Sequence, residues 1–306
     1  MEKIMSRYKM GFVILHYCTM EMTIQSVETI QQHMEEDNYA IIVVDNASYN
    51  GTGKELEEHY RSDDKVMVLL SEENIGFAKG NNIGYAYAKN ELGCDFICVM
   101  NNDVMISQPD FITKVYEDYE QCHFAVEGPH IRLKNGQENA MYYKLASVEH
   151  LIRERNGYIR RLKHTRSRFY QLYRLRDMLM LKLRIFLGKI HVMEEFKLHE
   201  EMTGGVHERH EDLILHGCCL IFSPDYLKQF EDAFDPSTFM FREEELLYLR
   251  CKKNGLPVVY NPCLDVLHLE DVATDFIYQT NKKKEIFNLE NQIDSMKILI
   301  ERLQEE

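Results

Sequence analysis

The chain has 306 residues, of which 45% are hydrophobic, and it carries a net charge of −14. This length and composition allow a sizeable core in one large domain or two modest ones, while the excess of negative charge argues against a nucleic-acid partner. The charged first ten residues, the lack of an eighteen-residue apolar window and eight scattered cysteines predict no signal peptide, no membrane span, no disulfide framework and a cytoplasmic setting.

The first half of the chain alternates short apolar runs with helical patterns. Runs rich in Val and Ile at 11–17, 40–46, 65–70 and 96–100 predict buried strands. Helices are expected between them, at 22–34, 53–60 and 83–90. Strands that alternate with helices predict an α/β fold with a parallel sheet covered on both faces. Ligands of such sheets bind beyond the carboxyl ends of the strands.

Each predicted strand is followed by polar residues. They are His16 and Tyr17 after the first strand, then 45–48, 71–82 and 101–103. Any one of these could be an ordinary polar loop, but four at one edge favour a binding site. The glycines of 71–82 fit neither G-x-G-x-x-G nor the Walker pattern, which makes a dehydrogenase unlikely. Its backbone amides and asparagines, at the start of a helix, suit a ribose or phosphate.

Three motifs, "VVDNAS", "NIGFAKGNNIGYAYA" and "VMNNDV", resemble in this order those of family 2 glycosyltransferases, especially bacterial rhamnosyltransferase-like members that build cell-surface polysaccharides. The resemblance covers 9–104 and 213–272. It implies a GT-A fold, with a mostly parallel sheet flanked by helices, and a UDP or dTDP sugar as the donor. It also implies that Asp45 contacts the base or the ribose of this donor. The residues that we expect to bind substrates are His16, Tyr17, Asp45, Asn74, Gly76, Lys79, Asn82, Asn101, Asn102, His216 and Gly217.

The resemblance also places residues 101–103 at the D-x-D position of the family. Asp103 is then expected to hold Mg²⁺ or Mn²⁺ through oxygen, and the cation would offset the charge of the diphosphate. Asn101 stands where the family often has the first Asp and can bond a ribose hydroxyl. His268 matches a late histidine that can reach the diphosphate or the metal. The alternatives are an Asn/Asp turn between elements and a histidine that is only hydrogen-bonded.

A second resemblance concerns the catalytic base. Aligning residues 239–241 with the family's aromatic lead-in puts Glu243 and Glu244 on its Glu-Asp pair. We predict Glu244 as the base, with Glu243 second, although Leu246 stands where another family acid is common. A base here would deprotonate the acceptor hydroxyl in an inverting displacement. The alternative is a solvated helix N-terminus, where the dipole favours Glu.

The remaining sequence predicts two helical additions. Fourteen Lys and Arg stand against five acidic residues between Lys144 and Lys197, and 158–190 predicts amphipathic helices. These helices pack on the chain or a partner subunit, or they rest on an anionic membrane surface. Residues 286–303 carry an a/d heptad pattern for packing within the chain or in a homo-oligomer. That pattern consists of Ile286, Leu289, Ile293, Met296, Ile300 and Leu303.

Four regions follow from these patterns: a nucleotide-sugar-binding half (1–140), a basic helical insertion (141–205), an acceptor-binding and catalytic half (206–280) and a C-terminal helix (281–306). The expected function is metal-dependent, inverting transfer of a sugar to a glycan or lipid-linked acceptor, on the cytoplasmic side and peripheral to the membrane. A noncatalytic nucleotide-sugar-binding homologue, or partner subunit of another transferase, is the alternative, and the departures at Asn101 and Leu246 are its support.

Overall fold

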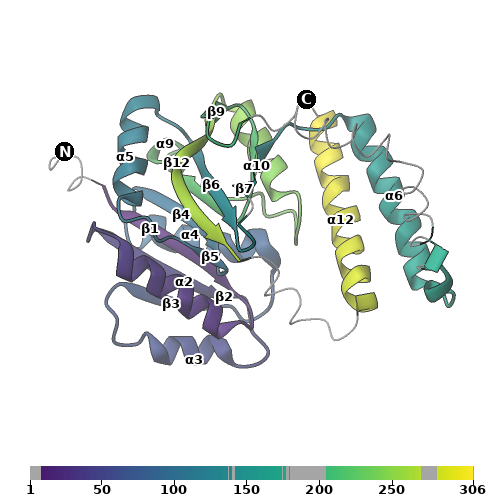
Figure 1. The fold of residues 1–306 in the computed structure, drawn as a ribbon, viewed down its shortest axis with the longest axis horizontal. Coiled ribbons are helices and arrows are strands. Elements are labelled where there is room, and N and C mark those ends of the chain that lie inside the picture. The colour runs from purple at the N-terminus through teal and green to yellow at the C-terminus, as the bar shows by residue number, and fades with distance from the viewer. Residues whose placement is uncertain are drawn as a thin grey trace.

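A computed structural model describes residues 8–136, 138–139, 142–173, 175–176, 179, 205–269 and 281–305. Most strands of this part form one mixed sheet, in the order β3-β2-β1-β4-β11-β6-β12-β5, with helices on both faces (Figure 1). The strands on this path are β1 (Met10–His16), β2 (Tyr39–Asp45), β3 (Val66–Leu70), β4 (Phe96–Asn101), β5 (Val104–Met105), β6 (Val126–Leu133), β11 (Cys219–Phe222) and β12 (Val258–His268).

Shorter elements complete the fold. Strand β7 (Glu138–Asn139) pairs with β6, β9 (His210–Glu211) pairs with β12, and β8 (Tyr142–Tyr143) pairs with β10 (Ile214–Leu215) in a separate two-stranded sheet. The helices are α2 (Met20–His33), α3 (Thr52–His59), α4 (Gly76–Asn90), α5 (Phe111–Cys122), α6 (Val148–Arg166), α9 (Pro224–Leu227), α10 (Glu243–Lys253) and α12 (Asn281–Gln304).

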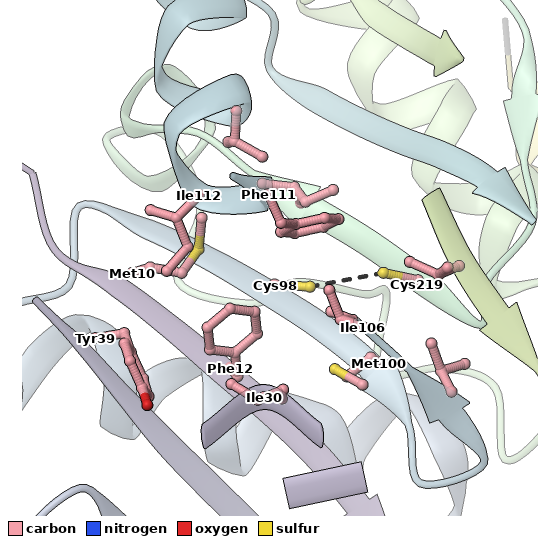
Figure 2. Close-up of a cluster of buried hydrophobic side chains, with 14 of the residues drawn as sticks. Met10, Phe12, Ile30, Tyr39, Cys98, Met100, Ile106, Phe111, Ile112 and Cys219 are labelled. Atoms are coloured by element: carbon pink, nitrogen blue, oxygen red, sulfur yellow. Dashed lines mark hydrogen bonds between the residues drawn. The ribbon is translucent and has the colours of Figure 1, made fainter. Parts of the chain in front are cut away.

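The parallel half of the sheet agrees with the alternating pattern of the sequence. Strands β1 to β4 are parallel, and their registers bring Leu15 beside Asn101 and His16 beside Asp45. Successive residues of β2 enter different cores: Ile41 packs under one face of the sheet and Ile42 under the other. Burial on both faces explains why these strands are apolar runs. Figure 2 shows the first of these cores.

The antiparallel half joins distant segments to the end of β4. Strand β11 lies antiparallel between β4 and β6, which places Cys219 beside Met100. Strand β12 runs parallel to β6 and antiparallel to β5, so His268 pairs with Val104, next to Asp103. All eight cysteines lie in the described part and form no disulfide; the sulfurs of Cys98 and Cys219 are 3.6 Å apart (Figure 2).

Helices α6, α10 and α12 share a third core beside the sheet. Helices α6 and α12 lie side by side (Figure 1), and Leu289, Met296 and Ile300 of the heptad pattern are buried. The heptad stripe is therefore used within the chain. Arg161 and Arg166 of α6 pair with Glu285 and Glu290 of α12. Of the predicted amphipathic segment 158–190, residues 174, 177–178 and 180–190 lie outside the described part of the chain. None of the described helices has the length and apolar character to cross a membrane.

Candidate active site

His16 and Asp45 lie together at the carboxyl ends of β1 and β2. The His16 ring is fully buried, and its Nδ1 and Nε2 lie 2.7 and 2.9 Å from the hydroxyls of Thr23 and Thr52. Burial lowers the pKa of His16 to about 4, against a smaller opposing effect of Asp45. Because both nitrogens have partners, His16 orients the loops around Asp45 and has no nitrogen left for a substrate.

Asp45 itself is held tightly. Its carboxylate accepts hydrogen bonds from the backbone N–H and hydroxyl of Ser48, and it is 5% exposed. A Cβ on Gly53 would lie 2.1 Å from Asp45 Oδ2, so only glycine fits there. This carboxylate is therefore fixed at the carboxyl edge of the sheet, and its contact with a nucleotide stays a prediction.

The loop before α4 is organised by Asn46, which was predicted only as part of the polar stretch 45–48 and not as a binding residue of its own. Its Nδ2 donates to Asn74 Oδ1 and to the Gly76 carbonyl, each at 3.1 Å, and its Oδ1 accepts from the Ile75 N–H at 3.0 Å. Gly76 has φ +86°, and a Cβ there would lie 2.2 Å from the Phe239 carbonyl oxygen. The only sequence signal for Asn46 is its place in "VVDNAS", next to Asp45. Asn74 and Gly76 thus belong to one rigid loop.

Three further predicted residues have different surroundings. Asn82 bonds the backbone N–H and C=O of Phe234, both at 2.9 Å, and so ties α4 to that segment. Its amide is therefore engaged by the chain itself. Lys79 is exposed on α4, and Tyr17 is half-buried beside Tyr49, with ring centroids 6.3 Å apart. Donor contacts from Lys79 and Tyr17 stay predictions.

The three residues that end β4 have three different environments. Asn101 lines a cavity and donates its backbone N–H to the Cys218 carbonyl. Asn102 is buried, and its Nδ2 donates to the hydroxyls of Thr19 and Thr23 at 2.8 and 2.9 Å. Asn102 therefore fixes the turn, whereas Asn101 faces open space.

Asp103 and His268 form a pair with unsatisfied atoms. His268 Nε2 lies 3.3 Å from Asp103 Oδ1, yet that oxygen and His268 Nδ1 are both buried without a hydrogen-bond partner. The carboxylate oxygen of Asp103 is the ligand type that Mg²⁺ and Mn²⁺ prefer, whereas an imidazole nitrogen is more typical of Zn²⁺, Fe or Cu sites. Within the described ranges, no group of three or more His, Cys, Asp or Glu could hold a metal ion. Asp103 would supply one oxygen ligand, so a cation here would need its other ligands from a phosphate or water.

A cavity of about 380 Å³ opens between the end of β4, the β10–β11 connection, α10 and α12. Its volume lies in the range of about 300–1,000 Å³ that is usual for small-molecule sites. His216 lines it, with Nδ1 accepting from the Cys218 N–H at 3.1 Å, and burial lowers the pKa of His216 to about 4. The ring is then neutral with its proton on Nε2.

Glu244 is placed in this cavity by Gly217. The Gly217 N–H donates to Glu244 Oε1 at 3.2 Å, and a Cβ on Gly217 would lie 2.6 Å from the same oxygen. Burial, together with the charge of Glu245, raises the pKa of Glu244 to about 7. A carboxylate with such a pKa can accept a proton near neutral pH. The structure therefore brings the predicted base, Glu244, to the predicted acceptor residues His216 and Gly217.

Glu243 has a different setting on the same helix. Thr238 Oγ1 donates to its Oε1 at 2.9 Å, and burial with the charge of Glu244 raises its pKa to about 8. Just before them, Phe241 and Arg242 have φ of 75° and 69°. Two consecutive left-handed non-glycine residues store backbone strain, which concentrates at functional sites. Neither Arg242 nor its ion pairs with Glu245 and Glu154 were predicted.

Comparisons with solved structures support the fold. S. aureus TarS 1–349 in complex with UDP-GlcNAc matches 93% of this chain and 65% of its own, with 13% identity and a TM-score of 0.52. GalNAc-T7 with UDP, GalNAc and Mn²⁺ matches 92% of this chain and 47% of its own, with 11% identity and a TM-score of 0.57. At these identities the likeness concerns the fold, which is the expected GT-A type.

Two sequence comparisons agree with that fold. The low-salt glycan biosynthesis hexosyltransferase Agl10 of Haloferax volcanii is 30% identical over 95 residues, which are 31% of this chain and 29% of that relative. The chain therefore matches less than a third of the length of this relative. The family profile described as "Glycosyl transferase family 2" matches residues 14–179, which include Asp45, the β3–α4 loop and Asp103. With more than half of its length matched and the fold in agreement, the chain belongs to glycosyl transferase family 2.

Proposed function

We propose that the protein is an inverting glycosyltransferase, which moves a hexosyl or rhamnosyl group from a UDP or dTDP sugar to a hydroxyl of a glycan or lipid-linked glycan. Family membership supports transfer of a sugar. The observation that carries the mechanism is Glu244, a carboxylate with a raised pKa that lines the cavity and is fixed by Gly217. The name of Agl10, a glycan biosynthesis hexosyltransferase, supports a role in glycan assembly, here in a cell-surface polysaccharide.

In the proposed reaction Glu244 accepts the proton of the acceptor hydroxyl. The acceptor oxygen forms a bond to the anomeric carbon, and the bond from that carbon to the diphosphate oxygen breaks with its electron pair on the diphosphate. One displacement inverts the configuration. Asp45 and the loop fixed by Asn46 would contact the nucleotide, and Asn101, which lines the cavity, would bond a ribose hydroxyl. General-base help of this kind is worth about 10²–10⁴ in rate.

The mechanism also includes a metal site. Asp103 and His268 would hold Mg²⁺ or Mn²⁺, which offsets the charge of the diphosphate when it is bound. The buried Asp103 Oδ1, which has no hydrogen-bond partner, and its position 3.3 Å from His268 Nε2 support this role. Replacing Asp103 with Asn would remove the only carboxylate of the pair, so we expect weaker, metal-independent binding of the nucleotide sugar.

The test is turnover of a panel of UDP, dTDP and GDP sugars with and without Mn²⁺. We expect Glu244→Gln to reduce turnover by about 10²–10⁴ and to leave nucleotide binding unchanged. Glu57→Gln, on the exposed face of α3, is the matched control and should match the wild type. Near-normal turnover by Glu244→Gln would refute Glu244 as the base. Binding of donors without turnover in the wild type would favour the noncatalytic alternative.

A further inference from the structure

Helix α12 lies outside the part of the chain that matches the family profile, yet it contributes a polar side chain to the cavity. Gln292 lines the cavity together with Glu243 and Glu244 of α10. Its Oε1 is buried and has no hydrogen-bond partner. A buried acceptor without a partner costs about 1–3 kcal/mol, so a native structure that keeps one needs a reason for it.

Gln292 stands on a firmly held helix. Ser295 Oγ donates to the Met240 carbonyl at 2.8 Å, directly before the turn that starts α10. Arg155 Nε of α6 donates to the Ile293 carbonyl at 3.2 Å, and Met296 is completely buried. The amide of Gln292 is therefore presented to the cavity from a rigid wall, as a binding residue requires.

A complementary donor is available in the same cavity. Arg242 gives NH1 to Glu245 and NH2 to Glu154, but its Nε is buried without a partner. Two residues that line the cavity thus carry a buried acceptor and a buried donor without partners, Gln292 Oε1 and Arg242 Nε. A hydroxyl group both donates and accepts, so sugar hydroxyls match this pair of requirements.

The other lining residues restrict the kind of sugar. Phe77, Tyr143 and Phe241 offer apolar ring surfaces, on which the C–H face of a pyranose can pack. The charged groups in the lining are three glutamates and one arginine, and Glu245 already pairs with that arginine. A carboxylate or phosphate on the bound sugar would find no unpaired cation among the lining residues to offset its charge.

We propose that Gln292 binds the acceptor in this cavity and that the acceptor's terminal residue is an uncharged sugar. The identification of this sugar as the acceptor rests on the proposed glycosyl transfer. In that reaction Gln292 holds one hydroxyl of the acceptor sugar, and the neighbouring hydroxyl of the same sugar meets Glu244. Binding of a neutral sugar to Gln292 can be measured without any turnover, so the two proposals can fail separately.

The test is ligand-observed NMR with p-nitrophenyl glycosides of glucose, galactose, rhamnose and glucuronic acid, on the full chain. We expect at least one neutral glycoside to bind and the glucuronide to bind more weakly than the glucoside. Gln292→Ala should weaken neutral binding roughly five- to tenfold, the usual effect of one lost hydrogen bond. Gln292→Met, which keeps the size of the side chain, should do the same at an unchanged unfolding temperature.

The matched control is Asn291→Ala. Asn291 is the preceding amide on α12, and its Nδ2 donates within the helix to the Phe287 carbonyl. It should leave glycoside binding unchanged. Equal binding by wild type and Gln292→Met, equal binding of glucuronide and glucoside, or no binding of any neutral glycoside would each overturn the inference. If glycoside binding depends on Gln292 but the protein turns over no donor, the inference about Gln292 would stand. The proposed glycosyl transfer would then be refuted.

Discussion

Two adjacent glutamates of α10 differ in what the surrounding chain leaves available. Glu243 has its Oε1 bonded by the Thr238 hydroxyl and is 3% exposed, whereas Glu244 is half-buried and bonded by a backbone N–H. The motif could identify this pair but not choose between its members, because the choice depends on Gly217, which is distant in sequence. Both glutamates line the cavity, and Glu244 is the less buried of the two, which supports our proposal that it is the base.

Glu243 makes stability depend on pH. The unfolded chain releases its proton near pH 4.5, but the folded chain holds it to about pH 8. Between these two pH values the folded state binds more protons than the unfolded chain. The contribution of the Glu243 carboxyl to the free energy of unfolding is therefore fully present below pH 4.5. It is lost as pH rises toward 8, by at most about 1.4 kcal/mol per pH unit. We expect Glu243→Gln to be more stable than wild type above pH 8 and nearly equal to it just above pH 4.5, in urea unfolding.

The Gln side chain keeps an oxygen for the Thr238 hydroxyl, so this variant changes charge with little change in shape. Glu57→Gln on α3 again serves as the exposed control and should show no pH-dependent gain. A Glu243→Gln protein that is no more stable than wild type above pH 8 would mean that the folded chain carries this carboxylate without penalty.

At the level of elements, the sequence could predict the parallel half of the sheet but not the antiparallel half. Strands buried on both faces produce the apolar runs of β1, β2 and β4, which local patterns reveal. Strand β11 has only four residues, and its place between β4 and β6 depends on contacts with residues far away in the chain. That placement brings His216 and Gly217 to Asp103, so the site could be predicted only through family motifs.

The residues that prediction missed are those with tertiary roles. Asn46 and Arg242 act through partners on other elements, and no local pattern marks such partners. Gln292 lines a cavity that forms only where α12 packs beside α10, which no local pattern marks either. Leu246, the departure from the family pattern, is buried in the core shared with α6 and α12. It has a packing role here, so its lack of a carboxylate is not by itself a sign of lost catalysis.

Helix α12 is expected to stabilise the catalytic helix through Met296. This side chain is fully buried among residues of α6 and α10, and truncating a buried Met to Ala costs about 2–5 kcal/mol. We expect Met296→Ala to lower the free energy of unfolding by that amount in urea titration. Met296→Ala should also slow transfer, because the adjacent Ser295 donates a hydrogen bond to the Met240 carbonyl, just before the start of α10.

Lys297→Ala is the control for this variant, since its side chain is 59% exposed on the same turn of α12. It should change stability by less than about 0.5 kcal/mol. A loss below about 1 kcal/mol in Met296→Ala would show that α12 contributes little to the folded state.

Across the whole molecule, charge is distributed unevenly. The segment from Lys144 to Lys197 has a local net charge of +9 in a chain of −14, which leaves −23 for the rest. Part of this positive charge is used within the chain, in the ion pairs that join α6 to Glu285 and Glu290 of α12. Other basic side chains of this segment, Arg160, Lys163 and Arg168 among them, are exposed.

Large apolar side chains are exposed next to these charges. Phe169 and Leu172 are 47% and 63% exposed, just beyond the end of α6. Basic and apolar groups on one helical segment are typical of a surface that rests on an anionic bilayer. This surface would bring the cavity to a lipid-linked acceptor, which is the membrane interpretation of the basic segment.

We therefore expect the protein to co-sediment with vesicles that contain an anionic lipid and not with purely zwitterionic vesicles. Each Lys or Arg near the headgroups contributes about 1 kcal/mol, so the double change Arg160→Glu and Lys163→Glu should weaken binding at least roughly thirtyfold. Lys297→Glu, an exposed charge reversal on α12, should have a much smaller effect. Binding that is independent of lipid charge, or equal for both variants, would remove the membrane role and leave α6 as a helix that packs only on its own chain.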